Sequence, residues 1–443
     1  MYDLVVVGAG AGGLAAAGRA ADRGARVLVL EKADAVGGSA AMSAGILWTA
    51  PDEATLRAVQ PRGDHELGAL LVSGFQQTVA DVAATGAGVS DQWREHLEFG
   101  VACKIDVHAL FAAWVANVRA AGGEVLTGVR DVRLLRDGGA VVGAAFVHSG
   151  EEREASAPAV VLATGGFAGD AQMRAEYIGH GADDIVVRAN PCSVGDGFRL
   201  GQSAGAAAST HMSAFYGHLL PSPLDVRPEH FLPLATYFSA YGILVNRAGR
   251  RFTDESLGDE VSNQRVIREV DQRAVLLWDA EVNAERVSAV PYPHGMAVDR
   301  FAAARDVGAR ALRAETLDDL LPGVSAWGVD AVHLAGTLDG YARAARGEAV
   351  GLDAPLPARP YPLASAPFYA IEVQPSITMT FGGLRADRDG RVLDRDGRPV
   401  PGLYGAGADV GGVQDLRYIG GLIVGLVFGR RAADAALNRR ERR

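Results

Sequence analysis

The chain has 443 residues, a formal net charge of −10 and 56 glycines, and 49% of its residues are hydrophobic. This length allows about two to three domains of roughly 150 residues each. Glycine is abundant, but it has no Gly-X-Y period and the apolar fraction is ordinary, which excludes collagen-like and disordered classes. We expect a compact protein whose backbone bends tightly or closely approaches another group.

The acidic balance argues against nucleic acid as a partner, because binding to phosphates needs clustered Lys and Arg. Cys103 and Cys192 are the only cysteines, too few for a disulfide framework, a CxxC redox pair or a zinc site. The N-terminus runs directly into a β-like stretch instead of a signal peptide, and no run of about 18 apolar residues occurs. A cytoplasmic protein with no metal site and no membrane span is expected.

The N-terminal segment has the pattern of a strand, a glycine turn, a helix and a second strand. The apolar run Leu4–Val7 precedes GAGAGG at 8–13, an Ala-rich stretch follows, and Arg26–Leu30 leads to Glu31. A GxGxxG motif in this context is typical of dinucleotide binding. Backbone N–H groups at the helix start suit a pyrophosphate, and Glu31 suits a ribose diol.

Further strands are expected over Glu124–Leu135, Ala140–Val147 and Ala159–Leu162, the last of which ends in ATGG at 163–166. From about Tyr216 to Leu356 the chain has more proline, more aromatic residues and helical charge spacing. The β-rich pattern then returns, with a strand over Phe368–Val373 and a hairpin over Asp387–Val400.

This order predicts an α/β protein with a discontinuous nucleotide-binding domain interrupted by a cap domain. We expect the nucleotide-binding domain to comprise residues 1–215 and 357–443, and the cap or substrate domain to comprise residues 216–356. Internal repeats and low-complexity linkers are absent from the sequence.

The spread of the glycine clusters indicates which cofactor to expect. A second cluster, VGGS at 36–39, follows Glu31, and a third, GLYGAGAD at 402–409, lies near the C-terminus. A cofactor contacted by both ends of the chain is long, and this distribution of motifs resembles that of FAD flavoproteins rather than NAD-binding proteins. Only one dinucleotide fingerprint is present, so a separate NAD(P)H domain is not expected.

The ordered motifs resemble the fumarate reductase/succinate dehydrogenase flavoprotein superfamily, and the active-site pattern is most similar to its 3-ketosteroid dehydrogenase-like branch. The matching segments are GAGAGG at 8–13, EK at 31–32, GGS at 37–39, ATGG at 163–166, GDG at 195–197, ILVNRAGRRF at 243–252, FGG at 381–383, GLYGAGAD at 402–409 and YIGG at 418–421. The resemblance implies a Rossmann-like FAD-binding domain of the glutathione reductase type with an inserted α+β cap.

The resemblance also implies the residues that contact FAD. The glycines at 8–13 would hold the pyrophosphate, Glu31 the adenosine ribose, Val129 the adenine through its backbone, and Asp409 the ribityl hydroxyls. Leu422 and Ile423 would open a helix directed at the flavin. The full implied set is Gly8, Gly10, Ala11, Gly13, Glu31, Lys32, Gly37, Gly38, Ser39, Ser43, Ala44, Gly45, Val129, Ala163, Thr164, Gly165, Asp196, Gly383, Gly407, Asp409, Leu422 and Ile423.

One departure from the family pattern concerns flavin attachment. Relatives with covalent flavin carry a histidine just after Gly-Gly-Ser, where this chain has Ala40. We therefore expect non-covalent FAD. With no second nucleotide fingerprint and no cysteine relay, electrons must be exchanged with a diffusing partner such as a quinone, a redox protein or oxygen.

Members of the superfamily make or remove a C=C bond next to a carbonyl, moving a hydride to or from flavin N5 and a proton at the neighbouring carbon. Fumarate reductases have an arginine acid a few residues after the RFxNE motif, where this chain has Asp259. They have a histidine where this chain has Met379, and a carboxylate-binding arginine where this chain has Tyr418, although Arg417 is adjacent. These departures argue against fumarate or succinate as substrate.

Tyr418 instead matches the ketosteroid dehydrogenase pattern, in which a tyrosine polarises a ketone together with a backbone N–H, here near Leu422. Asp259 occupies the position of that branch's tyrosine base, and a buried carboxylate with a raised pKa would suit the role. Packed or solvated roles remain open for both residues. His211, Tyr216 and His218 lie where relatives place substrate-contacting residues, although a histidine in such a loop is more often structural than catalytic.

The sequence thus predicts an FAD-dependent enzyme that desaturates, or in reverse reduces, a C–C bond next to a carbonyl in a cyclic or hydrophobic ketone. The catalytic candidates are Tyr418, Asp259, Arg417 and His211. One alternative is a dicarboxylate or enoate reductase with a rebuilt site in which Arg417 faces the substrate. Another is an FAD-binding escort protein without redox function.

Overall fold

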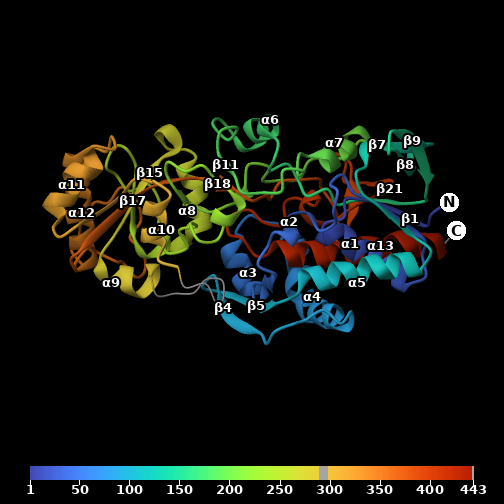
Figure 1. Ribbon diagram of the computed structural model, residues 1–443, viewed down its shortest axis with the longest axis horizontal. Helices are drawn as coiled ribbons and strands as arrows, with labels where there is room; N and C mark the ends of the chain where they lie inside the picture. Colours follow the sequence, from blue (N-terminus) through green and yellow to red (C-terminus); the bar gives the residue numbers. More distant parts are fainter. Residues whose placement is uncertain (289–297, 442–443) are drawn as a thin grey trace. The chain divides into compact units, whose positions relative to one another are not determined.

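The computed structural model describes residues 1–288 and 298–441, with side chains up to residue 438. The chain divides into two compact units (Figure 1). Unit 1 comprises residues 1–183, 189–215 and 379–443, and unit 2 comprises residues 184–188 and 216–378.

A six-stranded sheet forms the centre of unit 1, in the order β20-β21-β10-β1-β2-β6. Neighbouring strands are parallel from β21 to β6, and β20 is antiparallel to β21. The central strands are short Val- and Leu-rich runs, as expected for parallel strands covered on both faces. Their bounds are β1 Leu4–Val7, β2 Val27–Leu30, β6 Glu124–Leu126, β10 Val160–Leu162, β20 Arg391–Leu393 and β21 Pro399–Gly405.

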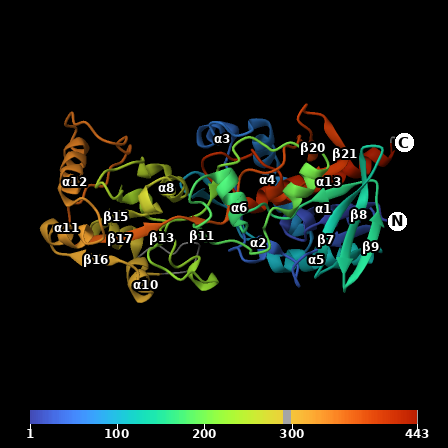
Figure 2. The ribbon, with the colours of Figure 1, turned by 90° about the horizontal axis from the view of Figure 1, so that it is seen from above.

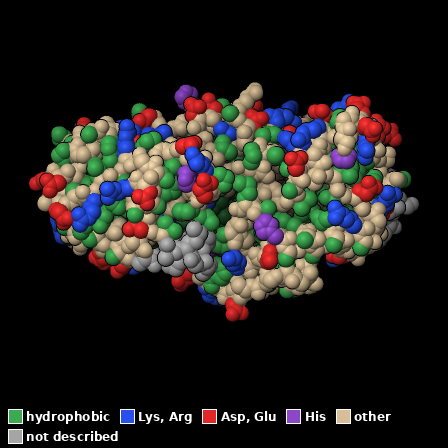
Figure 3. Space-filling model, in the orientation of Figure 1, with side chains coloured by type: hydrophobic (Ala, Val, Ile, Leu, Met, Phe, Trp, Pro, Cys, Tyr) green, Lys and Arg blue, Asp and Glu red, His purple; other side chains and the backbone are tan. Residues whose placement is uncertain are grey.

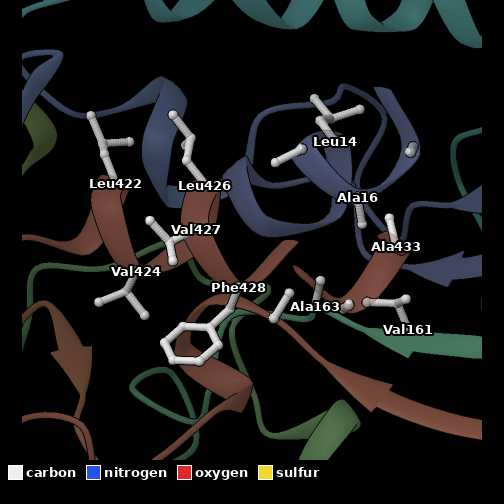
Figure 4. Close-up of a cluster of buried hydrophobic side chains, with 14 of the residues drawn as sticks. Leu14, Ala16, Val161, Ala163, Leu422, Val424, Leu426, Val427, Phe428 and Ala433 are labelled. Atoms are coloured by element: carbon white, nitrogen blue, oxygen red, sulfur yellow. The ribbon is translucent and has the colours of Figure 1, made fainter. Parts of the chain in front are cut away.

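Helices cover one face of this sheet and a second sheet covers the other. On the helical face, Val6, Val29 and Val161 pack in one cluster with α1 (Ala11–Asp22), α5 (Val107–Ala120) and α13 (Gly421–Glu441), as Figure 4 shows in part. On the opposite face, Val5, Val7 and Leu28 pack against β8. The covering sheet is antiparallel and consists of β7 (Arg130–Asp137), β8 (Ala140–His148) and β9 (Glu151–Ser156) (Figure 2).

Small residues let α1 and α13 approach closely, although the two helices are about 400 residues apart in sequence. A Cβ at Gly429 would lie 2.3 Å from the carbonyl oxygen of Gly12, and one at Gly425 would lie 3.1 Å from the Gly12 nitrogen. Side chains larger than hydrogen would therefore push the helices apart. This contact brings the C-terminal helix against the glycine-rich start of α1.

Unit 1 also contains a small antiparallel sheet, β3-β5-β4, and several further helices. The bounds of these elements are α2 Gly38–Ala41, β3 Ile46–Thr49, α3 Glu53–Val59, α4 His65–Ala84, β4 Trp93–His96, β5 Gly100–Lys104, α6 Ala171–Met173 and α7 Asp196–Ser203.

Unit 2 is built on an antiparallel sheet in which β17 pairs with β13, β15 and β16, and β14 pairs with β15. Helices α8, α10, α11 and α12 belong to the same unit. The bounds are β13 Leu220–Pro221, β14 Ile243–Val245, α8 Asp259–Val266, β15 Ala274–Trp278, α9 Ala280–Val282, α10 Arg300–Asp306, β16 Ala311–Ala314, α11 Leu317–Ser325, α12 Ala331–Ala345 and β17 Phe368–Gln374.

The boundary expected at residue 357 needs correction. Residues 357–378 belong to unit 2, because β17 is the strand to which three others of the unit 2 sheet are hydrogen-bonded. A short segment, residues 184–188, also joins unit 2, since Val186–Val187 pairs with Ser376–Ile377. The strand pattern beyond residue 368 predicts a return to the nucleotide-binding domain there, whereas the chain returns to unit 1 at Met379.

The described helices include none that is long and apolar enough to cross a membrane. On the face drawn in Figure 3, acidic and basic side chains are interspersed, without a large area of either sign.

Candidate active site

The three glycine clusters of the sequence meet at the start of α1. Gly10 forms a β-bridge with Gly37, and a Cβ at Gly12 would lie 2.9 Å from the nitrogen of Gly407. Gly8 has φ +101°, and its Cβ would lie 2.3 Å from the carbonyl oxygen of Ala163. Segments from both ends of the chain and from its middle therefore surround one helix N-terminus.

This arrangement fits a dinucleotide pyrophosphate. A Cβ at Gly10 would have no neighbour closer than the Gly37 oxygen at 3.9 Å, so the protein itself does not require a glycine there. Among the described residues, α1 has no side-chain cap at its N-terminus. Open space beside backbone N–H groups at a helix start is what an anionic group needs.

Glu31 lies at the end of β2 and is buried. One carboxylate oxygen accepts a hydrogen bond from the Ala9 N–H at 2.7 Å and the other from the Ala33 N–H at 2.8 Å. Glu31 thus fixes the glycine turn while its remaining lone pairs can accept ribose hydroxyls. The next residue, Lys32, forms an ion pair with Asp196 at 2.7 Å, which joins two residues of the implied cofactor set.

Asp409 holds the segment that follows β10. Its carboxylate accepts hydrogen bonds from the N–H of Thr164 at 2.5 Å and of Gly166 at 3.1 Å. The Thr164 hydroxyl in turn accepts the Gly197 N–H at 2.8 Å. Burial raises the pKa of Asp409. The Asp409 side chain thus fixes the ATGG segment through hydrogen bonds, and its contact with the ribityl chain of FAD stays a prediction.

The other implied cofactor residues lie in unit 1 as well. The N–H of Val129 donates to the Glu31 carbonyl at 2.9 Å, so a backbone contact with adenine would use the Val129 carbonyl. The helix α2 and the residues just after it contain Gly38, Ser39, Ser43, Ala44 and Gly45. A Cβ at Gly383 would lie 2.9 Å from the Ala408 oxygen and 2.8 Å from the Asp409 oxygen. The first turn of α13 contains Leu422 and Ile423.

Tyr418 lies just before α13. Its hydroxyl oxygen accepts a hydrogen bond from the Gly421 N–H at 2.6 Å. Its ring packs edge-on against Trp48 of β3, with centroids 5.5 Å apart. Gly420, with φ +104°, allows this close turn, because a Cβ there would lie 2.3 Å from the Trp48 carbonyl oxygen. A hydroxyl that accepts a hydrogen bond still carries a proton that it can donate.

Gln60, which sequence reasoning missed, fixes the segment before Tyr418. Its buried side chain accepts the N–H groups of Asp415 at 2.8 Å and Leu416 at 3.2 Å, and it donates to the Arg417 carbonyl. A glutamine more than 350 residues away carries no sequence signal of this contact.

Arg417 is engaged by a different part of unit 1. Its guanidinium donates to the Leu97 carbonyl at 3.3 Å, pairs with Glu98 at 3.3 Å and lies over the Phe99 ring at 4.7 Å from the centroid. The side chain is 11% exposed. The contacts are all in the hairpin between β4 and β5, in which Leu97 and Glu98 have positive φ.

His211 also has a structural partner. Its Nε2 lies 2.6 Å from the carbonyl oxygen of Arg62, and its φ is +58°. The contact ties the segment after α7 to the segment that contains Gln60.

Asp259 opens α8 in unit 2 and is only 4% exposed. One carboxylate oxygen forms a short hydrogen bond with Nδ1 of His218, and the other accepts the hydroxyls of Thr236 at 3.1 Å and Ser239 at 3.3 Å. On the far side of the imidazole, Nε2 lies 2.6 Å from the Tyr216 hydroxyl. The sequence singles out Tyr216, His218 and Asp259 individually, but it does not indicate that they are hydrogen-bonded to one another.

Residues 3–423 match the protein family described as FAD binding domain. The chain is 28% identical to a fumarate reductase (cytochrome) of Shewanella frigidimarina, over 98% of this chain and 76% of that protein. It is also 28% identical to a 4-oxocyclohexanecarboxylate 2-dehydrogenase of Sinomonas cyclohexanicum, over 98% of this chain and 96% of that protein.

Among solved structures, the fold is similar to that of the 3-ketosteroid-Δ4-(5α)-dehydrogenase from Rhodococcus jostii RHA1, with a TM-score of 0.77 at 24% identity, covering 98% of this chain and 96% of that one. These matches confirm the superfamily that the motifs predicted, and with it FAD as the cofactor. The chain belongs to the FAD-binding flavoprotein family and is an FAD-dependent oxidoreductase that acts on CH–CH groups.

Proposed function

We propose that this enzyme desaturates, or in reverse reduces, a C–C bond next to the carbonyl of a cyclic or hydrophobic ketone. The observation that carries the proposal is the Tyr418 hydroxyl, fixed by the Gly421 N–H at 2.6 Å and by the Trp48 ring. A neutral donor held in this way suits the oxygen of a ketone, on which negative charge develops when the α-proton leaves.

The surroundings of Arg417 support a ketone over a dicarboxylate. A carboxylate substrate calls for a cation that can turn toward it, usually a bidentate arginine. The Arg417 guanidinium already contacts Leu97, Glu98 and Phe99 and would have to give up these contacts. We therefore assign Arg417 to holding the β4–β5 hairpin against the segment of Tyr418.

When bound, FAD supplies the two-electron chemistry by accepting or donating a hydride. The chain supplies the remaining functions. Unit 1 provides the pyrophosphate turn at Gly8–Gly13, the ribose acceptor Glu31 and the donor Tyr418. Within unit 2, Asp259 and His218 form a buried hydrogen-bonded pair suited to acid–base chemistry. We propose that unit 1 is the Rossmann-like FAD-binding domain and unit 2 the cap.

The family includes enzymes on either side of this proposal. The 4-oxocyclohexanecarboxylate 2-dehydrogenase carries a ring ketone in its substrate's name and favours the proposal, whereas the fumarate reductase favours a dicarboxylate. A dicarboxylate or enoate reductase with a rebuilt site is therefore the second candidate function.

We further propose that FAD is held without a covalent bond and that electrons pass to a diffusing partner. Ala40 in α2 stands where a covalently linked relative would have histidine. Acid precipitation of the yellow protein should leave the flavin in the supernatant, and flavin retained in the pellet would contradict this.

Anaerobic mixing of the yellow protein with a substrate panel tests the proposed activity. The panel contains cyclohexanone, 4-oxocyclohexanecarboxylate, androst-4-ene-3,17-dione and succinate, and the readout is bleaching of the visible flavin band. The reverse direction uses reduced protein with cyclohexenone and fumarate. We expect the ketones or the enone to react. Reaction with succinate or fumarate alone would favour the second candidate, and no reaction with any of these compounds would contradict both candidates.

A further inference from the structure

A hydrogen-bonded chain in unit 2 connects a half-buried hydroxyl to a fully buried carboxylate. The Tyr216 hydroxyl lies 2.6 Å from Nε2 of His218, and Nδ1 of His218 forms a short hydrogen bond with Asp259. His218 is 1% exposed and Asp259 4% exposed, whereas Tyr216 is half-buried. Tyr216 is thus the most exposed of the three residues.

Both carboxylate oxygens of Asp259 have hydrogen-bond partners in the protein. One oxygen is occupied by His218, and the other accepts the Thr236 and Ser239 hydroxyls and, at 3.4 Å, the Leu219 N–H. A carboxylate in such a setting can orient and stabilise an imidazole but cannot itself abstract a proton from carbon. We therefore place Asp259 in a relay rather than in direct contact with the reacting carbon.

The His218 imidazole, which lies between Tyr216 and Asp259, is held in one orientation. The ring has two aromatic neighbours in edge-to-face geometry, with the Tyr237 centroid at 4.6 Å and the Tyr216 centroid at 5.0 Å. The backbone of His218 is fixed by Ser376, whose hydroxyl donates to the His218 carbonyl at 2.6 Å and accepts its N–H at 3.2 Å. An imidazole locked between a hydroxyl and a carboxylate has the geometry of a proton relay.

We propose that Tyr216, His218 and Asp259 form the proton relay of this enzyme, in which the Tyr216 oxygen exchanges the proton with the substrate, His218 carries it, and Asp259 takes it up at the buried end of the relay. The inference rests on the proposed function and deepens it by naming the acid–base group.

The proton transfers balance without a further reactant. In the desaturating direction the α C–H bond breaks, its electron pair passes to the carbonyl as an enolate, and its proton goes to the Tyr216 oxygen. That oxygen gives its own proton to Nε2 of His218, and the imidazole, now protonated on both nitrogens, donates from Nδ1 to Asp259. In the reducing direction the same protons move the opposite way.

The charges around the relay set when it can accept a proton. Burial raises the pKa of Asp259 to about 7, with the Arg188 guanidinium opposing the rise. Burial also lowers the pKa of His218 well below its ordinary value, helped by Arg188 and opposed by Glu260. The neighbouring Tyr237 has its pKa raised by burial, with Arg188, Arg300, Asp259 and Glu260 as its charged neighbours.

These directions give the relay one titration near pH 7. Above it, Asp259 is a carboxylate that accepts the Nδ1 proton, so Nε2 is free to accept from Tyr216. Below it, the pair holds one more proton and Nε2 carries a hydrogen. We expect base catalysis to rise with pH through about 7 and acid catalysis to fall.

Deuterium exchange at the α-carbon tests the relay apart from net turnover. Protein reduced with dithionite cannot oxidise a ketone, so exchange from D₂O into the panel ketone that bleaches the wild type fastest reports proton transfer alone, measured by NMR. Tyr216→Phe should slow exchange by about 100-fold or more. Asp259→Asn should slow exchange and remove the pH midpoint near 7. Tyr361→Phe, a tyrosine of the same unit outside the relay, is the matched control and should exchange at the wild-type rate.

Two checks keep the outcomes distinct. The low-field proton resonance of the His218–Asp259 hydrogen bond should persist in Tyr216→Phe and vanish in Asp259→Asn, which shows that the first variant is folded around its relay. If ketones bleach the wild type but Tyr216→Phe exchanges at the wild-type rate, or if the pH midpoint survives Asp259→Asn, the relay is wrong and the proposed function stands. If no carbonyl compound bleaches or exchanges, both fall together.

Discussion

Replacing Tyr418 by phenylalanine removes one oxygen atom and leaves the ring in place. The packing on Trp48, at 5.5 Å between centroids, involves only the ring and is retained. The variant loses the acceptor of the Gly421 N–H at 2.6 Å and the proton that we assign to the substrate carbonyl. Loss of one such transition-state donor costs about 10²–10³ in rate, or about 3–4 kcal/mol.

The assay measures, by anaerobic stopped-flow absorbance, the rate at which the panel ketone that reacts fastest with the wild type bleaches the flavin. We expect the limiting rate to fall by about 10²–10³ while FAD occupancy is unchanged, because the glycine turn and Glu31 do not depend on the lost oxygen. Leaving the Gly421 N–H without its acceptor should also cost about 1–3 kcal/mol of stability.

Tyr341→Phe is a matched control for that stability cost. The Tyr341 hydroxyl accepts the Tyr361 N–H at 3.1 Å, in a buried part of unit 2. This variant loses a comparable hydrogen bond, so its stability should fall similarly while its bleaching rate stays at the wild-type value. A bleaching rate for Tyr418→Phe equal to that of Tyr341→Phe would refute the assignment of Tyr418.

Three further predictions follow from single contacts. The variant Gln60→Leu loses the three hydrogen bonds that fix residues 415–417. Because these residues precede Tyr418, the limiting rate of flavin bleaching should fall about tenfold with little change in KM. A change confined to KM would contradict a role of Gln60 in positioning Tyr418. The variant Glu31→Gln replaces one of the two oxygens that accept the Ala9 and Ala33 N–H groups by an NH₂ donor. The Kd of the apoprotein for FAD, measured by flavin fluorescence, should therefore rise about 10- to 100-fold. An unchanged Kd would show that Glu31 is not part of the cofactor site. In the folded protein, burial raises the pKa of Asp259 from 3.8 to about 7. The protonated carboxyl therefore contributes stability at low pH, and this contribution is lost as pH rises through about 7, so the free energy of unfolding of the wild type, measured in urea, should fall by about 2–3 kcal/mol relative to that of Asp259→Asn between pH 5 and 8. A difference between the two proteins that does not vary with pH would mean that Asp259 does not titrate in this range.

The cofactor site was predictable from sequence because its determinants are local. A strand, a glycine turn and a helix within residues 4–22 fix the direction of backbone N–H groups, and glycines with φ near +100° or close backbone contacts admit no other residue. The three clusters around Gly10, Gly37 and Gly407 were expected to meet on one cofactor, and they do lie together.

The parts that failed or were missed depend on contacts between distant residues. The strand predicted over Phe368–Val373 is present as β17, but its pairing with residues 274–278 and 311–314 decides to which unit it belongs. Gln60 acts on a segment more than 350 residues away, and the His218–Asp259 hydrogen bond spans 41 residues. Local pattern gives the type of an element, whereas pairing and side-chain contact come from the tertiary fold.

Product identification after a single anaerobic turnover tests the central proposal most directly. The yellow protein is mixed with an equimolar panel ketone until the flavin band is bleached, and the organic product is examined by NMR and mass spectrometry. We expect one conjugated C=C bond next to the carbonyl for each flavin bleached, with the loss of two hydrogens. Bleaching by succinate with formation of fumarate, and none by any ketone, would contradict it.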